Sequence, residues 1–151
     1  MSNPELQDRF FNMMQSFHRL HFDRLFTSIS KMEFFALRSL CALHYKSKSD
    51  TPIYVSDLTK HMHLFPSAIS RLLKGLESKG YIVREVDPNN RRNTIIQLTQ
   101  EGEDLAKQLQ DRMQTYVDQV FEKMEDKDME ELLRLSNKLF TCMQEELDTY
   151  K

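Results

Sequence analysis

Glycine and tryptophan are scarce in this sequence, which has three glycines and no tryptophan among 151 residues. This composition favours a helix-dominated protein. The sequence contains no glycine-rich phosphate loop, and no histidine, carboxylate and nucleophile stand in a pattern that is typical of catalysis. We therefore expect a protein that is not an enzyme and that has no cofactor.

Long apolar runs are also missing, since no stretch approaches the ~20 residues that span a bilayer. The first residues, MSNPELQDRF, lack the basic start and apolar core of a secretory signal. Two cysteines, Cys41 and Cys142, do not make a disulfide framework. With 40% apolar residues in a chain of one domain's length, we expect a cytoplasmic protein with a core and no membrane partner.

Residues 81–98 have the pattern of a β-hairpin. Two segments with strand-like patterning, the second rich in β-branched residues, flank the turn signal Asp-Pro-Asn-Asn at residues 87–90. Arg91 and Arg92 follow this turn, and paired guanidinium groups at a hairpin tip can reach phosphates or a narrow DNA groove. The alternative for the same residues is an ordinary solvated turn.

Two short helical patterns precede the hairpin. The first covers residues 55–62, and the second begins at Pro66, which suits a first helical position because its missing N–H needs no partner there. Gly80 stands where a left-handed C-terminal cap belongs. The apolar face of the second helix holds Ile69, Leu72, Leu73 and Leu76, and the opposite face holds Ser67, Ser70, Arg71 and Lys74. A helix, a turn, a helix with a basic face and a basic hairpin together predict a winged helix-turn-helix.

These segments resemble the MarR family of transcription regulators. The resembling stretches are VSDLTKHM, PSAISRLLKGLESKGYI, DPNNRR and QLTQEG, in the order and spacing of that family. The resemblance implies a two-fold homodimer whose recognition helices enter successive major grooves while the wings contact the flanking minor groove. The residues that we expect to contact DNA are Pro66, Ser67, Ser70, Arg71, Lys74, Arg91 and Arg92.

Two positions depart from the pattern of the family. Asn90 stands where the family usually has an aspartate beside its wing arginines, so a charged clamp is reduced to a neutral hydrogen bond at best. Phe65 stands where a serine or threonine often caps the recognition helix, so that cap must come from elsewhere or be missing.

The charge is distributed unevenly along the chain. The formal net charge is −2, but residues 56–98 carry +3, residues 1–55 carry +2 and residues 99–151 carry −7. Positive charge is therefore concentrated in the proposed DNA reader, which is typical of nucleic-acid binding.

Amphipathic helices are predicted on both sides of the reader. Residues 4 to about 27 repeat apolar side chains at helical spacing, and Ser30 and Glu33 form a capping box that starts a helix to about Lys46. Thr99 is the expected N-cap of a long helix, and a final helix restarts after a break at residues 125–126.

We divide the chain into an N-terminal dimerisation helix (1–29), a winged helix-turn-helix (30–98) and C-terminal dimerisation helices (99–151). Long amphipathic helices outside a compact reader need a surface that covers their apolar side. A second copy of this chain is the partner that we expect, and packing within one chain is the alternative.

The family resemblance further implies a ligand-responsive repressor with a small-molecule pocket between the dimerisation helices and the reader. The candidate lining residues, which combine polar groups with positions near this junction, are His18, His21, Arg38, Cys41 and Tyr45. A metal site at His18 and His21 is an alternative, although two such histidines are more often polar surface. Cys41 or Cys142 could sense oxidants, but apolar helical neighbours favour a core role for both thiols.

The sequence thus predicts a mainly α protein with a small β-wing, in which terminal dimerisation helices flank a winged helix-turn-helix. The function that we expect is a sequence-specific DNA-binding transcription regulator, a homodimer on a pseudo-palindromic operator. Its partners would be double-stranded DNA, a second copy of the chain and a small-molecule effector. The alternative function is a winged-helix protein-interaction module that does not bind DNA.

Overall fold

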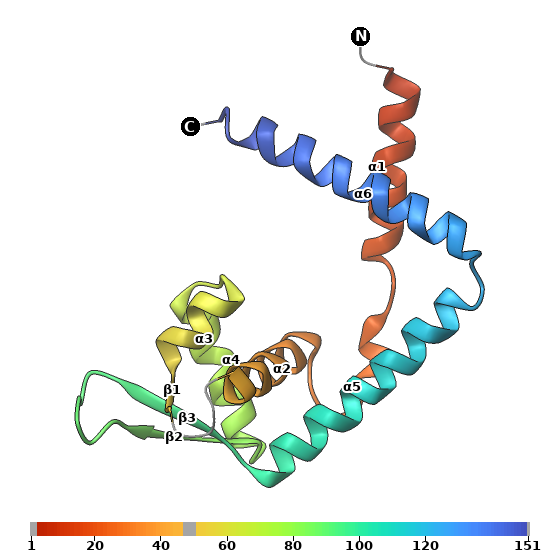
Figure 1. Cartoon of the computed structure of the whole chain (residues 1–151). Helices are drawn as coiled ribbons and strands as arrows, with labels where there is room; N and C mark the ends of the chain where they lie inside the picture. The colour runs from red at the N-terminus through yellow and green to blue at the C-terminus, as the bar shows by residue number, and fades with distance from the viewer. Residues whose placement is uncertain (1–2, 47–50, 151) are drawn as a thin grey trace. The chain divides into compact units, whose positions relative to one another are not determined.

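The computed structural model describes residues 3–46 and 51–150, which form helices and one small sheet (Figure 1). The elements in chain order are α1 (Pro4–His18), a 3-10 turn (Phe22–Leu25), α2 (Lys31–Lys46), β1 (Ile53–Tyr54), α3 (Val55–Met62), α4 (Pro66–Ser78), β2 (Ile82–Val86), β3 (Thr94–Leu98), α5 (Gln100–Phe121) and α6 (Asp126–Leu147). Two compact units divide the chain, the first ending at Gln110 and the second beginning at Asp111, so α5 contributes to both. The predicted fold class is confirmed.

Helix α1 is shorter than the sequence predicts. Its first turn is capped by Asn3, whose side chain accepts a hydrogen bond from the Leu6 N–H, and the helix ends at His18. The prediction of one helix continuing to about residue 27 was wrong, because a break and a separate 3-10 turn follow. Residues 19–21 contain neither glycine nor proline, so the sequence carries no stop signal at this point.

The predicted capping box at the start of α2 is confirmed. The Ser30 N–H donates to Glu33 Oε2 at 2.7 Å, and the Glu33 N–H donates to Ser30 Oγ at 3.2 Å. Lys79 Nζ, just past the end of α4, also donates to both oxygens of this carboxylate, at 2.9 and 2.8 Å. Burial alone would raise the pKa of Glu33, but the hydrogen bonds from Lys79 and Ser30 outweigh it and lower that pKa. A single carboxylate therefore joins the start of α2 to the end of α4.

The core lies in the first unit, between α2, α3, α4 and the sheet. Phe34 of α2 stacks on Phe26 with ring centroids 4.8 Å apart. Of the two thiols expected in the core, Cys41 of α2 is half-buried, whereas Cys142 of α6 is exposed. The largest fully buried side chains are Phe34, Leu37, Leu40, Leu58, Ile69, Leu73, Leu76, Ile82 and Leu109.

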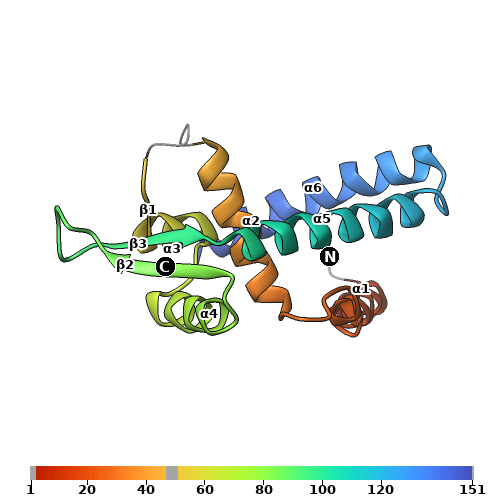
Figure 2. The same cartoon turned by 90° about the horizontal axis from the view of Figure 1, so that it is seen from below.

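The three-stranded antiparallel sheet has the order β1-β3-β2. Ile53 of β1 pairs with Ile96 of β3, which adds a third strand to the hairpin, and Ile82 of β2 pairs with Leu98 of β3. The β2–β3 hairpin extends away from α2, α3 and α4 as a wing (Figure 2). The position of this wing is therefore set by the strand pairs at its base.

The hairpin is joined tightly to the helices on either side of it. Gly80 ends α4 with φ 78°, the left-handed conformation that glycine adopts without strain. Thr99 Oγ1 accepts a hydrogen bond from the Gly102 N–H at 3.1 Å, so Thr99 is the predicted N-cap of α5. A Cβ on Gly102 would collide with the Tyr81 carbonyl oxygen, so only glycine fits this close approach.

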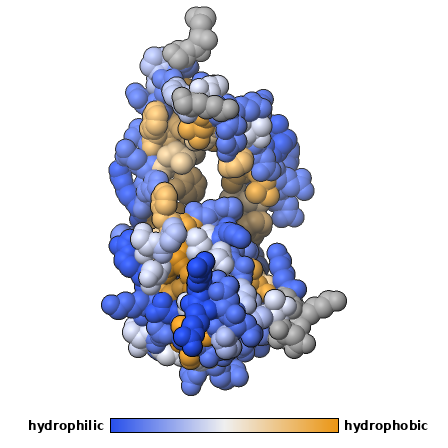
Figure 3. Space-filling view, turned by 90° about the vertical axis from the view of Figure 1, so that its left-hand side faces the viewer, coloured by the Kyte–Doolittle hydropathy of each residue, from blue (hydrophilic) through white to orange (hydrophobic). Residues whose placement is uncertain are grey.

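The helices at the two ends of the chain keep much of their apolar surface exposed. Among the described residues, neither α1 nor α6 has one that is buried. Figure 3 shows uncovered apolar side chains in its upper part. The most exposed large apolar residues of these two helices are Leu6, Phe11, Phe17, Leu133, Phe140 and Leu147. Across the described chain, no helix is long and apolar enough to cross a membrane.

Candidate nucleic-acid interface

Five of the predicted DNA contacts lie on α4. Pro66 occupies the first turn of the helix, as predicted, and its ring is exposed. Ser67, Ser70, Arg71 and Lys74 are all exposed, on the side opposite the buried Ile69, Leu73 and Leu76. The folded helix therefore presents two hydroxyl groups and two cations on one outward face, while its leucines hold it against the core.

The start of α4 lacks the side-chain cap that most helices have. Phe65 is the N-cap residue and makes no side-chain hydrogen bond, as the sequence predicts for this substitution. Its carbonyl oxygen accepts hydrogen bonds from the N–H groups of Ala68 and Ile69, at 3.0 and 3.2 Å. Phe65 as a whole is 81% exposed.

The wing tip places Arg91 and Arg92 in solvent, next to an ordered turn. The Asn93 N–H donates to the Asn90 carbonyl at 2.8 Å, and the Asp87 N–H donates to the Asn93 carbonyl at 3.0 Å. The Asn90 side chain accepts a hydrogen bond from the Arg92 backbone N–H at 3.2 Å. Asn90 thus supplies the neutral hydrogen bond expected of it, and that bond fixes the backbone of Arg92.

A buried carboxylate fastens the wing to the start of α3, and the sequence analysis missed it. Asp87 is only 5% exposed and accepts hydrogen bonds from the Tyr54 hydroxyl at 2.9 Å and the Asn89 N–H at 2.8 Å. The hydrogen bond to Asp87, with burial and the carboxylate charge, raises the pKa of Tyr54. Tyr54 and Asp87 are 33 residues apart, so no local pattern signals the pair.

Two of the basic residues in the winged helix are used within the protein. Arg84 Nε and Nη2 donate to Glu77 Oε2 at 3.1 and 2.5 Å, and these bonds lower the pKa of Glu77. Lys79 is held by Glu33. The cations of residues 56–98 that stay exposed and form no ion pair within the described chain are Lys60, Arg71, Lys74, Arg91 and Arg92.

A groove of about 540 Å³ lies between α3, α4 and the wing. It brings Pro66 and Ser70 of α4 next to Arg92 of the wing tip. Lys60 and Thr59 of α3 also line it, and the sequence analysis did not assign them to the interface. Their helical spacing gave no sign that α3 shares a groove with the wing. The groove therefore holds three predicted contacts and a further exposed cation.

The predicted effector residues are spread over the first unit. His18 ends α1, His21 lies 3.7 Å from Asp23, and both are exposed. Arg38 and Tyr45 are exposed on α2, and burial, with the nearby charge of Glu103, raises the pKa of Cys41. None of the five lines the cavities described here, and their role stays a prediction. The described residues contain no cluster of three or more metal-binding side chains.

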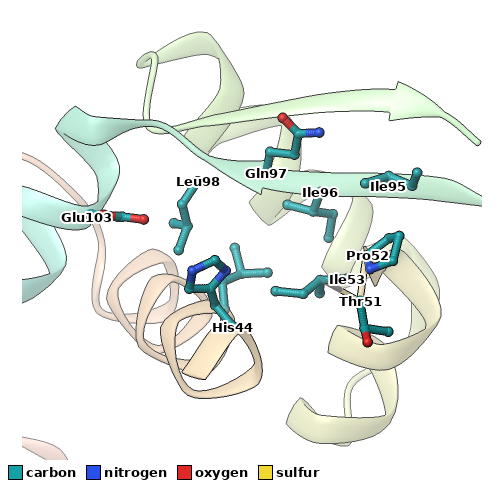
Figure 4. A pocket seen from close by; sticks show the side chains of 10 residues that line it. His44, Thr51, Pro52, Ile53, Ile95, Ile96, Gln97, Leu98 and Glu103 are labelled. Atoms are coloured by element: carbon teal, nitrogen blue, oxygen red, sulfur yellow. The ribbon is translucent and has the colours of Figure 1, made fainter. Parts of the chain in front are cut away.

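A separate cavity of about 360 Å³ lies between the C-terminal part of α2, the sheet and the first turn of α5. Figure 4 shows Ile53 and Ile96 close together in its lining and Leu98 beside the His44 ring. Glu103 approaches from α5. The volume of the cavity lies within the range of small-molecule sites, and its lining combines isoleucine and leucine side chains with an imidazole and a carboxylate.

Comparison with known proteins agrees with this geometry. Residues 48–94 match the model of the MarR family. An uncharacterized HTH-type transcriptional regulator of Bacillus subtilis, YwhA, is 32% identical over 85 residues, which is 56% of this chain and 61% of that protein. The chain thus matches less than two thirds of the length of this relative.

Two solved structures have the same fold. The Staphylococcus aureus MepR–DNA complex gives a TM-score of 0.66 at 18% identity, covering 95% of this chain and 99% of that one. The PcaV transcriptional regulator of Streptomyces coelicolor, in complex with its natural ligand, gives 0.66 at 16% identity, covering 87% and 89%. At these identities the likeness shows a shared fold.

Proposed function

We propose that this chain, whose residues 48–94 match the model of the MarR family, is a DNA-binding transcription regulator. The observation that carries the proposal is the set of five exposed cations from α3, α4 and the wing that form no ion pair with any residue the structure describes. Cations on one surface bind the phosphate backbone of DNA, and an outward helix with hydroxyl and guanidinium groups can read base edges.

The proposed active form is a homodimer on a pseudo-palindromic operator. The exposed apolar sides of α1 and α6 support it, since neither helix has a buried residue in the described chain. A two-fold dimer presents two copies of α4, so its half-sites should lie ~10 bp apart, one turn of the double helix.

A small molecule would control this binding, most simply as the inducer of a repressor. Two places are candidates for it: the predicted junction of the dimerisation helices with the reader, to which we assigned His18, His21, Arg38, Cys41 and Tyr45, and the cavity beside His44 and Glu103. The ligand complex of the structural neighbour PcaV supports a ligand response in this fold.

Selection of a duplex from random sequences by the purified full-length protein tests the proposal. We expect enrichment of an inverted repeat, and we expect Arg71→Ala to weaken binding to it at least ~10-fold, because one base-reading arginine is worth ~1–3 kcal/mol. Lys107→Ala on α5 is the matched control, since Lys107 is an exposed cation away from α3, α4 and the wing. If no duplex is enriched from the random sequences, the alternative function, a winged-helix protein-interaction module that does not bind DNA, would be favoured.

The wing has a different expected signature. Replacing Arg91 and Arg92 together by alanine should weaken binding to many sequences alike, because interactions with the DNA backbone carry no base information. The slope of log K against log salt should become shallower by ~0.9 for each phosphate that an arginine of either subunit no longer neutralises. An unchanged slope would mean that the wing does not contact DNA.

A further inference from the structure

Phe65 breaks a local rule of helix structure. Serine, threonine, aspartate or asparagine at an N-cap satisfies a free N–H of the first turn, whereas the Phe65 side chain satisfies none. The ring is also left in water, at 81% exposure. Nothing in the fold accounts for a phenylalanine here, and residues that break a local rule without a structural gain are often functional.

The backbone holds this ring in a defined place. Phe65 has the extended φ and ψ of −66° and 146° that the following Pro66 favours, and its carbonyl oxygen accepts two hydrogen bonds from the first turn of α4. The ring therefore stands at the N-terminal end of the outward helix, directly before Pro66 and Ser67. Among residues 55–98, Phe65 is the most exposed large apolar side chain, ahead of Val86 at 58% and Val83 at 49%.

We propose that Phe65 contacts the 5-methyl group of a thymine and so makes the operator thymine-specific at one position of each half-site. The inference rests on the proposed function, in which the N-terminal end of α4 faces base edges. The thymine methyl is the apolar group that the major groove offers, and phenylalanine is among the side chains that contact it. Lys60 lines the groove that Pro66 and Ser70 also line, and Arg71 is exposed on the outward face of α4.

Thymine-to-uracil replacement in the selected duplex tests the proposal, because it removes one methyl group and leaves base pairing unchanged. Each symmetric pair of thymines is replaced in turn, and the affinity of the full-length protein is measured for every duplex. At one symmetric pair we expect binding to weaken by about four-fold per half-site, as for one buried methyl group. The variant Phe65→Ala should bind the thymine and uracil forms of that duplex equally.

Two further variants keep the result specific. Phe65→Leu retains an apolar side chain and should keep part of the preference for thymine over uracil. Met32→Ala removes another exposed apolar side chain, at 40%, that lies on α2, and it should keep the full preference. The thermal midpoints of all three proteins should stay close to that of the wild type, since the altered side chains are exposed.

The outcomes separate the inference from the proposed function. Equal loss of affinity by Phe65→Ala on thymine and uracil duplexes would overturn the inference and place the ring against the sugar–phosphate backbone. So would a wild-type protein that ignores every uracil while Arg71→Ala still weakens binding. A wild-type protein that selects no duplex would instead overturn the proposed function itself.

Discussion

Helices α4 and α6 have the same kind of amphipathic sequence, but the apolar side chains of α4 are buried in the folded chain and those of α6 are exposed. Three apolar residues of α4, Ile69, Leu73 and Leu76, are fully buried, whereas Leu133 and Phe140 of α6 are 53% and 69% exposed. An amphipathic pattern shows that one side of a helix needs cover, and it does not show what covers it. In the winged helix the cover comes from the same chain. For the terminal helices we propose that it comes from a second copy.

The largest expected effect lies in the buried region. Leu37 is fully buried in α2, so Leu37→Ala should lower the free energy of unfolding by about 2–5 kcal/mol, since it removes apolar packing and leaves a cavity. Chemical denaturation at a fixed protein concentration measures this change. A decrease below about 1 kcal/mol would mean that the core is not packed as described.

A substitution on the apolar side of a terminal helix should weaken the proposed dimer. Phe140→Glu places a charge on the exposed apolar side of α6 and should raise the dissociation constant of the proposed dimer at least ~100-fold, about 2.7 kcal/mol, because the contact is made twice. Analytical ultracentrifugation over a range of protein concentrations measures it. Thr141→Glu is the control, on an exposed polar position that is turned about 100° from Phe140 around the same helix. If both variants dissociate alike, the apolar side of α6 is not the interface.

Replacing one glutamate in each region compares how much the two regions depend on their ion pairs for stability. Glu33→Gln should lower the free energy of unfolding by about 1–3 kcal/mol, because the carboxylate is mostly buried and accepts bonds from Ser30 and Lys79. Glu131→Gln on α6 breaks an exposed pair with Arg134 and should have a much smaller effect on that free energy, since water screens exposed pairs. Equal effects would erase the distinction between the two regions.

The same glutamate predicts a pH dependence. The pKa of Glu33 is lower in the folded protein than its ordinary value of 4.5, so its stabilisation is present above pH 4.5 and is lost as the pH falls through the lowered folded pKa. Denaturation curves of wild type and Glu33→Gln should therefore converge in acid. A difference that stays constant below pH 4.5 would contradict this assignment.

The smallest effect is expected at the wing tip. Asn90→Asp turns the neutral hydrogen bond to the Arg92 N–H into a charge-assisted one and should tighten DNA binding by about two- to five-fold, through a better ordered arginine. Filter binding at moderate salt measures it. Weaker binding would show that repulsion between the added negative charge and DNA outweighs the gain from a better ordered arginine.

Sequence reasoning succeeded where the physical signal is local. The capping box of Ser30 and Glu33, the left-handed Gly80 and the start of α4 at Pro66 each depend on neighbours within a few residues. It failed where the partner is distant in sequence, as for Tyr54 and Asp87 or for Lys79 and Glu33. Sequence reasoning also extended α1 beyond His18, where the helix ends. The apolar residues keep their helical spacing across this break, and no glycine or proline marks it.

The number of chains bound to one selected duplex tests the account most directly. Sedimentation of full-length protein with a duplex that carries both half-sites should give two chains per duplex, and a duplex with one half-site should bind far more weakly. Phe140→Glu should lose this two-chain complex while keeping its folded winged helix. A single chain bound with undiminished affinity to one half-site would contradict the claim that the terminal helices join two DNA readers.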